Sequence, residues 1–140
     1  MTDEDNLSIY DYPRFTSPET WRQVLQTSGN ANITGLPVSN SSLALSNSIV
    51  AKAGPGTLFG ASILNTKISA QFIQVFDAAA VPADGAVPVA VYTVGASSNL
   101  GLYWGSVGRW HNIGIVLCNS STAATKTIGS ADCFFDVQYF

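Results

Sequence analysis

Residues 57–77, TLFGASILNTKISAQFIQVFD, contain two strand-like runs separated by a polar turn. The first run covers residues 57–64, the second covers residues 68–76, and Asn65-Thr66-Lys67 lies between them. Both runs are rich in β-branched and aromatic residues, which pack well on a pleated sheet. The alternation of the second run slips once at Gln74, as a β-bulge would cause. This segment therefore predicts two consecutive strands.

Five further strands are expected, one before this segment and four after it. The first shows apolar residues with a period of two, and the others are bounded by turn residues. Pro88 places one of them at a sheet edge or makes it begin after Pro88, because proline has no N–H to donate. The expected ranges are residues 43–50, 87–94, 99–104, 111–118 and 132–140.

Seven short strands with no helical pattern between them predict an all-β fold. We expect an antiparallel β-sandwich, jelly-roll or immunoglobulin-like, of about seven to eight strands with an extended N-terminal arm. The expected core consists of Leu43, Leu45, Ile49, Leu58, Ile63, Phe72, Val75, Val89, Val91, Leu102, Ile113, Ile115, Leu117, Phe134 and Val137.

The composition favours the same fold class. The chain has 140 residues, the length of one domain. Hydrophobic residues make up 46%, but charged residues only 11%, less than half of the usual quarter. Long exposed helices normally carry many Glu and Lys residues, so a chain with so few charged residues is not expected to form them.

Charge is concentrated at the N-terminus. Residues 1–22 hold five acids and two bases, a net charge of −3, whereas four bases and four acids cancel over residues 23–140. No basic patch is available to bind a phosphate backbone, so nucleic acid is not expected as a partner. A nearly neutral body gains little from self-repulsion, which suits a subunit packed against neighbours.

The N-terminal residues also bear on localisation. Met1 is followed by an acidic run, where a secretory signal has a basic region and then an apolar one. No apolar stretch approaches the roughly 18 to 20 residues of a membrane helix. We therefore expect synthesis in a cytoplasm and no membrane partner. Cys118 and Cys133 are then expected to be buried, reduced thiols, with a disulfide between paired strands as the alternative.

Residues 1–37 are expected to form the arm, and residues 38–140 the β-body. Within the arm, Ser17 can cap a helix, Pro18 suits its first position and Gly29 ends it, which allows one or two helical turns. A helix this short is not stable alone in water. The aromatic side chains of the arm must therefore pack on the β-body or on a partner: Tyr10, Tyr12, Phe15 and Trp21.

Few residues of the β-body suit acid–base or metal chemistry. His111 has no Asp-x-His or His-x-His companion, so a structural role is expected. The chain has no Gly-x-Ser-x-Gly elbow for a nucleophile and no acidic calcium-binding loop. Asp77 fits a strand-end cap, and Asp84 fits a turn. We expect neither an enzyme nor a cofactor or metal site.

One segment combines aromatic residues, a base and glycines. Tyr103-Trp104 and Arg109-Trp110 flank the turn at residues 105–108. If exposed, these side chains form a surface that can stack on a sugar or dock a protein. The alternative is that they fill the core, with Arg109 stacked on a tryptophan.

Residues from about 49 to 140 resemble a small β-domain that recurs in virion proteins of tailed bacteriophages, of the head-decoration, fibre and tail type. The resemblance rests on the order of seven segments, whereas the N-terminal third departs from it. These segments are Gly56-Thr57-Leu58 leading to Asn65, QFIQVFDA at 71–78, VPADGAVP at 81–88, Gly108-Arg109, Gly114-Ile115-Val116, SSTAATKT at 120–127 and FFDVQYF at 134–140.

The resemblance implies a non-enzymatic subunit on the surface of a phage particle. Its leading form is a capsid decoration, or cement, protein whose β-body forms a homotrimer. The arm would bind the shell subunits, which are the major capsid protein. The alternative is a head-fibre or tail module that binds a host-surface glycan through Tyr103, Trp104, Arg109 and Trp110.

Overall fold

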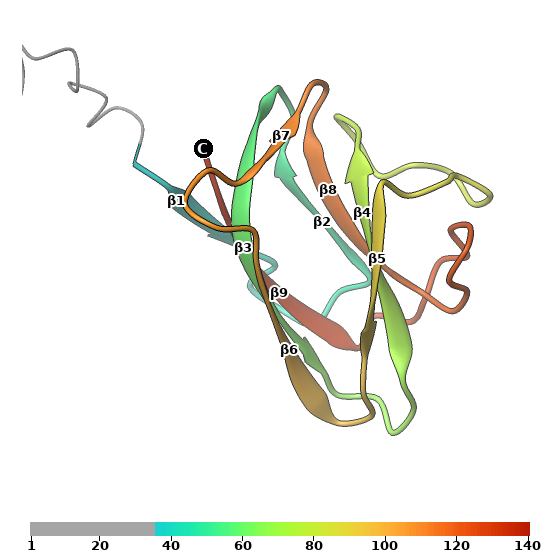
Figure 1. Ribbon diagram of the computed structural model, residues 1–140. Helices are drawn as coiled ribbons and strands as arrows, with labels where there is room; N and C mark the ends of the chain where they lie inside the picture. Colours follow the sequence, from blue (N-terminus) through green and yellow to red (C-terminus); the bar gives the residue numbers. More distant parts are fainter. Residues whose placement is uncertain (1–35) are drawn as a thin grey trace, which may run out of the picture. The chain divides into compact units, whose positions relative to one another are not determined.

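A computed structural model describes residues 36–140. The arm aromatics Tyr10, Tyr12, Phe15 and Trp21 and the helix expected near them lie outside the described residues. Within the described part, the chain contains no helix and nine strands (Figure 1). The strands are β1 (Val38–Ser41), β2 (Ser48–Lys52), β3 (Gly56–Asn65), β4 (Gln71–Asp77), β5 (Ala90–Val94), β6 (Ser98–Tyr103), β7 (Arg109–His111), β8 (Ile115–Ser120) and β9 (Cys133–Tyr139).

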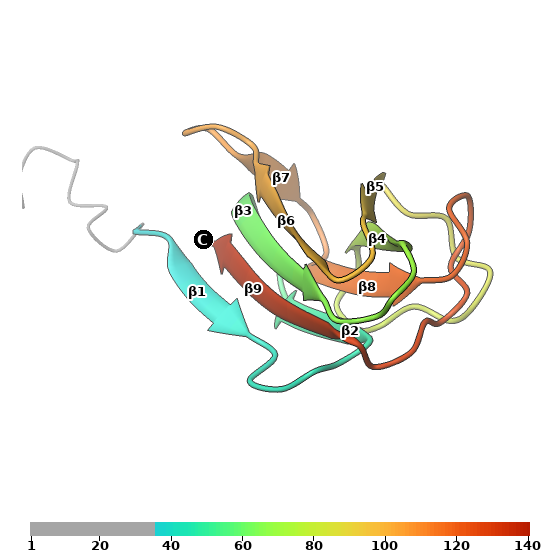
Figure 2. The same cartoon turned by 90° about the horizontal axis from the view of Figure 1, so that it is seen from below.

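The strands form two antiparallel sheets that face each other (Figure 2). The five-stranded sheet has the order β1-β9-β3-β6, and β7 also pairs with β3. The four-stranded sheet has the order β2-β8-β4-β5. The expected all-β architecture of two antiparallel sheets is therefore confirmed, with nine strands rather than seven or eight.

β3 is the central strand of the five-stranded sheet. It pairs with β9 on one side and with both β6 and β7 on the other. β6 pairs with Gly60–Asn65 and β7 with Gly56–Leu58, so these two strands follow one another along the same edge of β3. The strand expected at residues 111–118 is therefore wrong, because the chain leaves the five-stranded sheet after His111 and enters the four-stranded sheet at Ile115.

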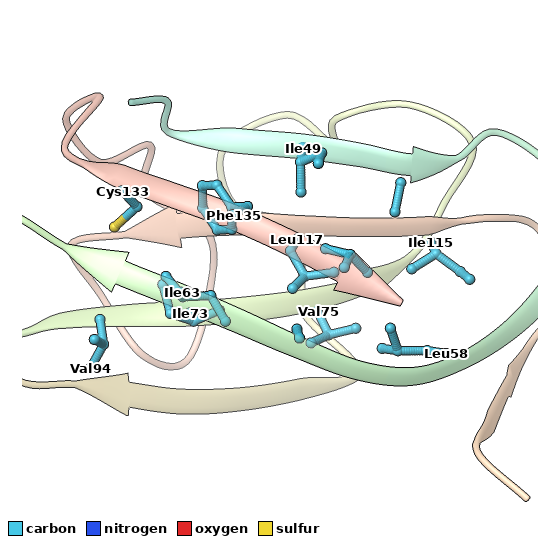
Figure 3. Close-up of a cluster of buried hydrophobic side chains, with 13 residues drawn as sticks. Ile49, Leu58, Ile63, Ile73, Val75, Val94, Ile115, Leu117, Cys133 and Phe135 are labelled. Atoms are coloured by element: carbon cyan, nitrogen blue, oxygen red, sulfur yellow. The ribbon is translucent and has the colours of Figure 1, made fainter. Parts of the chain in front are cut away.

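The main core lies between the two sheets (Figure 3). Residues of β3 that face the core include Leu58, Ala61 and Ile63. Leu58 and Ala61 are three residues apart because a bulge between Leu58 and Gly60 adds one residue to the alternation. Seven expected core residues are buried there: Ile49, Leu58, Ile63, Val75, Ile115, Leu117 and Val137. The sequence pattern missed Ala51, Ala61, Ile73, Val94 and Phe135, whereas Cys133, which was expected to be buried, also belongs to this cluster.

Two expected core residues lie in a loop instead of a strand. β2 begins only at Ser48, and Leu43 is 87% exposed, with Leu45 exposed beside it. The hydroxyl of Ser42 donates to the backbone oxygen of Ala44 and accepts from the backbone N–H of Phe135. These bonds turn the chain at Leu43, whose φ of 58° is in the left-handed region, and its side chain points to solvent.

On β4 and β9, one expected core residue each is wrong by one position. Ile73 and Phe135 are fully buried, whereas their expected neighbours Phe72 and Phe134 are only half-buried. The register of β4 with β5 and β8 is continuous through Gln74, so the predicted bulge is absent from this strand. The apolar residues of β4 do not alternate regularly with polar ones, because both faces of the strand are covered.

A second, smaller cluster covers the outer face of the four-stranded sheet. Phe76, Val116 and Cys118 are buried there against Ala78 and Ala86 of the following loop. Cys118 and Cys133 are both buried free thiols, as expected, and they belong to different clusters. Val89, Val91 and Ile113, which were expected in the core, are exposed.

Candidate functional site

Two aromatic side chains stand on the outer face of the five-stranded sheet. Tyr103 lies opposite Gly60, and Trp110 lies opposite Thr57. Directly opposite residues in an antiparallel pair share a face, and the neighbouring pair of Ala61 and Leu102 faces the core. Tyr103 is 78% exposed and Trp110 is 60% exposed. Both side chains are therefore available to a partner.

Trp104 has a different environment from Tyr103. It is half-buried and packs against the main core, with its ring edge-on to Tyr92 at a centroid distance of 5.9 Å. This T-shaped contact lies within the favourable range for aromatic pairs. Because Tyr92 belongs to β5 and Trp104 follows β6, the contact joins the two sheets at one side of the sandwich.

Arg109 also joins the sheets. Its guanidinium donates a hydrogen bond of 2.9 Å to the backbone oxygen of Val89, just before β5. The indole N–H of Trp110 donates instead to Asn112 Oδ1, at 2.8 Å. Of the four residues singled out in this segment, Tyr103 and Trp110 thus form the exposed surface, while Trp104 and Arg109 hold it in place.

His111 is a buried structural residue. Its Nδ1 lies 3.1 Å from the backbone oxygen of Arg109 and donates to it when that nitrogen carries the proton. Its Nε2 is buried and has no hydrogen-bond partner among the described residues. Burial removes the ring from water and lowers the pKa of His111, which keeps the imidazole neutral.

Asp77 caps the end of β4, as its position in the sequence suggested. Its carboxylate accepts hydrogen bonds from the backbone N–H groups of Asn112, Ile113 and Gly114, at 3.1, 2.7 and 3.2 Å. Burial of Asp77 alone would raise its pKa, but these three donors outweigh burial and lower the pKa. The same bonds hold the 112–114 turn, which leaves the Ile113 side chain exposed.

Asp84 and Lys126 connect the two loops over the four-stranded sheet. Lys126 is only 4% exposed, and its Nζ lies 2.8 Å from Asp84 Oδ1. That carboxylate also accepts from the backbone N–H of Ile128. The hydrogen bond from Lys126 is the main reason why the pKa of Asp84 is lowered. Beneath the loops, Gln74 Nε2 donates to the backbone oxygens of residues 122, 123 and 125.

A second exposed apolar surface lies along β5. Val91 of β5 is exposed between Ala90 and Tyr92, which pack against the main core, and Val87 and Val89 in the loop before β5 are also exposed. The sequence pattern placed Val89 and Val91 in the core. The alternation of apolar residues was visible in the sequence, but it does not show which side of the sheet they face. Val91 pairs with Gln74, which is on the outer side of β4, so Val91 faces outward.

Residues 36–140 contain no group of three or more His, Cys, Asp or Glu side chains that could hold a metal ion. They also include no helix that is long and apolar enough to cross a membrane. The chain matches no protein-family model, no curated protein and no solved structure. Its function is therefore inferred from its residues and their geometry.

Proposed function

We propose that this protein is a structural subunit of a bacteriophage virion, a capsid decoration protein. In this proposal the β-body self-associates on the outside of the shell. The N-terminal arm, residues 1–37, contacts the major capsid protein. The activity is binding, and no chemical step is required.

The observation that carries this proposal is the exposed apolar surface of a nearly uncharged β-body. Tyr103, Trp110 and the valines along β5 are exposed, although residues 23–140 offer only four acids and four bases to keep such a surface soluble. Interface cores are depleted in charge and enriched in aromatic residues. Exposed apolar surface of this kind marks binding sites in soluble proteins.

The N-terminal arm has the residues expected for a contact with the shell. Its first 22 residues carry a net charge of −3 and its aromatic residues include Tyr10, Tyr12 and Phe15. Acidic residues favour a shell surface rich in Lys and Arg, and aromatic anchors supply a large share of the binding energy at protein interfaces. The chain enters the β-body at β1, an edge strand of the five-stranded sheet.

Deletion of residues 2–22 tests the proposal. We expect the truncated protein to lose co-sedimentation with shells that lack the native protein, while its far-ultraviolet circular dichroism keeps the β signal. The full-length variant Gly54→Ala is the control and should bind like the wild type, because the arm is intact and a Cβ at Gly54 meets no atom within 4 Å. Undiminished binding of the truncated protein would overturn the role of the arm.

The number of copies per particle tests the virion assignment itself. Quantitative mass spectrometry of purified particles should give a simple ratio of this chain to the major capsid protein. Complete absence of the chain from particles would overturn the assignment.

A host-glycan module of a fibre or tail is the second candidate. Tyr103 and Trp110 favour it, because both are exposed on one sheet face, where the polar Gln138 shares a row with Tyr103 across Gly60. Aromatic rings next to hydrogen-bonding side chains suit the faces and hydroxyl groups of sugars. A few copies per particle, rather than a ratio close to that of the shell protein, would favour this candidate.

A further inference from the structure

The outer edge of β5 differs from the other sheet edges in its lack of protection. Exposed edge strands offer unpaired N–H and C=O groups, and proteins usually blunt them with charges, bulges or short length. β5 pairs with β4 in continuous register from Val94 to Ala90. No described strand pairs with its other side.

The other edges carry such protection. β2 has a register shift between Val50 and Lys52, and it ends at that lysine. β1 and β7 have only four and three residues. Two of the three outward positions of β6, Asn99 and Gly101, hold poor strand formers, and the third is Tyr103. The outward positions of β5, Val91 and Thr93, both hold good ones.

β5 and the sequence on either side of it contain no charged residue. Residues 85–108, which include β5 and β6, contain no Asp, Glu, Lys, Arg or His. Of the charged residues that flank this stretch, Asp84 pairs with Lys126, and Arg109 places its guanidinium before the beginning of β5, on the backbone oxygen of Val89. Figure 2 places β5 and β6 at the same side of the sandwich. That side therefore has an apolar, uncharged edge along β5.

The absence of charge indicates which partner fits this edge. At a two-fold contact, a surface meets its own copy, so a charge near the axis meets a charge of the same sign. An uncharged edge avoids that repulsion. A partner of different composition would instead be recognised through complementary charges, which the acidic arm offers and β5 does not.

We infer that β5 is the contact between two copies of this chain, which pair β5 antiparallel to β5 across a two-fold axis. The four-stranded sheet then continues into the second copy, and the outward side chains of β5, Val91 and Thr93, lie beside the symmetry axis. This inference rests on the self-association in the proposed function, and it replaces the expected trimer with an even-numbered assembly.

Light scattering after gel filtration and sedimentation equilibrium of the full-length chain test the inference. The wild type should form an even-numbered oligomer. Val91→Lys should raise the dissociation constant at least about tenfold, because it places like charges across the axis. Thr93→Lys should do the same and loses no apolar contact, so it keeps the test valid if Val91→Lys misfolds.

Asn99→Lys is the matched control, because it puts the same charge on an exposed position of β6. It should assemble like the wild type. An equimolar mixture of Val91→Lys and Val91→Glu should recover the assembly. A monomeric or trimeric wild type would overturn the inference, as would assembly of Thr93→Lys that equals the wild type. Particle binding by the arm is measured separately, so a trimeric wild type that binds particles overturns the inference alone, whereas a monomeric wild type also removes self-association from the proposed function.

Discussion

At the scale of single residues, Gly114 occupies a position that no larger residue fits. A Cβ atom built there would lie 2.8 Å from the backbone oxygen of Lys52 and closer still to that of Ala78. Both neighbours are backbone atoms that cannot rotate away. Gly114→Ala should therefore lower the free energy of unfolding by about 1–3 kcal/mol, the usual cost of overpacking. Urea denaturation followed by tryptophan fluorescence measures this change.

Gly101→Ala provides the comparison for that experiment. A Cβ at Gly101 meets no atom within 4 Å, and its φ is not in the left-handed region. Alanine at such a site should leave stability unchanged or raise it by up to about 1 kcal/mol, because the unfolded chain loses freedom. Equal stabilities for the two variants would show that the turn at Gly114 has room to adjust.

At the scale of elements, the pair of Asp84 and Lys126 holds two loops over β4. Asp84→Ala leaves the Lys126 ammonium buried without a counter-charge, and such a charge is strongly unfavourable. We expect the backbone N–H groups of Gly85 and Lys126, which hydrogen-bond between the loops, to exchange with solvent at least about tenfold faster. Hydrogen exchange measured by NMR reports this at single residues.

The double variant Asp84→Ala/Lys126→Met separates loss of the ion pair from loss of a contact. Methionine removes the buried charge, so slow exchange should return. Acid should act like Asp84→Ala in the wild type. The pKa of Asp84 is lowered in the folded state, so the pairing stabilises fully above the ordinary carboxyl pKa and is lost as the pH falls through the lowered value. Unchanged exchange in Asp84→Ala would contradict this role.

At the scale of the whole molecule, the four-stranded sheet separates two apolar clusters. Cys118 lies in the outer cluster and Cys133 in the main core, and burial raises the pKa of each thiol to about 11. The sheet between them prevents a disulfide. Both thiols should react with an aromatic disulfide reagent only on global unfolding, and the melting temperature should not depend on reductant. Rapid labelling of either cysteine in native buffer would show local opening of its cluster.

The sequence by itself determined the fold class and the position of several strands. The expected ranges 57–64, 99–104 and 132–140 agree within one residue at each end with β3, β6 and β9. Alternation, turn residues and the low charge are local properties, so they can be recognised without knowing what each strand packs against. The exposure of Tyr103 and Trp110 stayed open at that stage, because an aromatic residue fits a core or a surface equally well.

Only the tertiary structure decided which face of each strand is buried. Gln74 was mistaken for a bulge because its burial comes from the loop at residues 122–125, far away in sequence. Val89 and Val91 looked like core residues, but both are exposed, and Val91 pairs with Gln74 on the outer side of the four-stranded sheet. Both outcomes depend on contacts between distant segments, and the alternation within one strand carries no information about them.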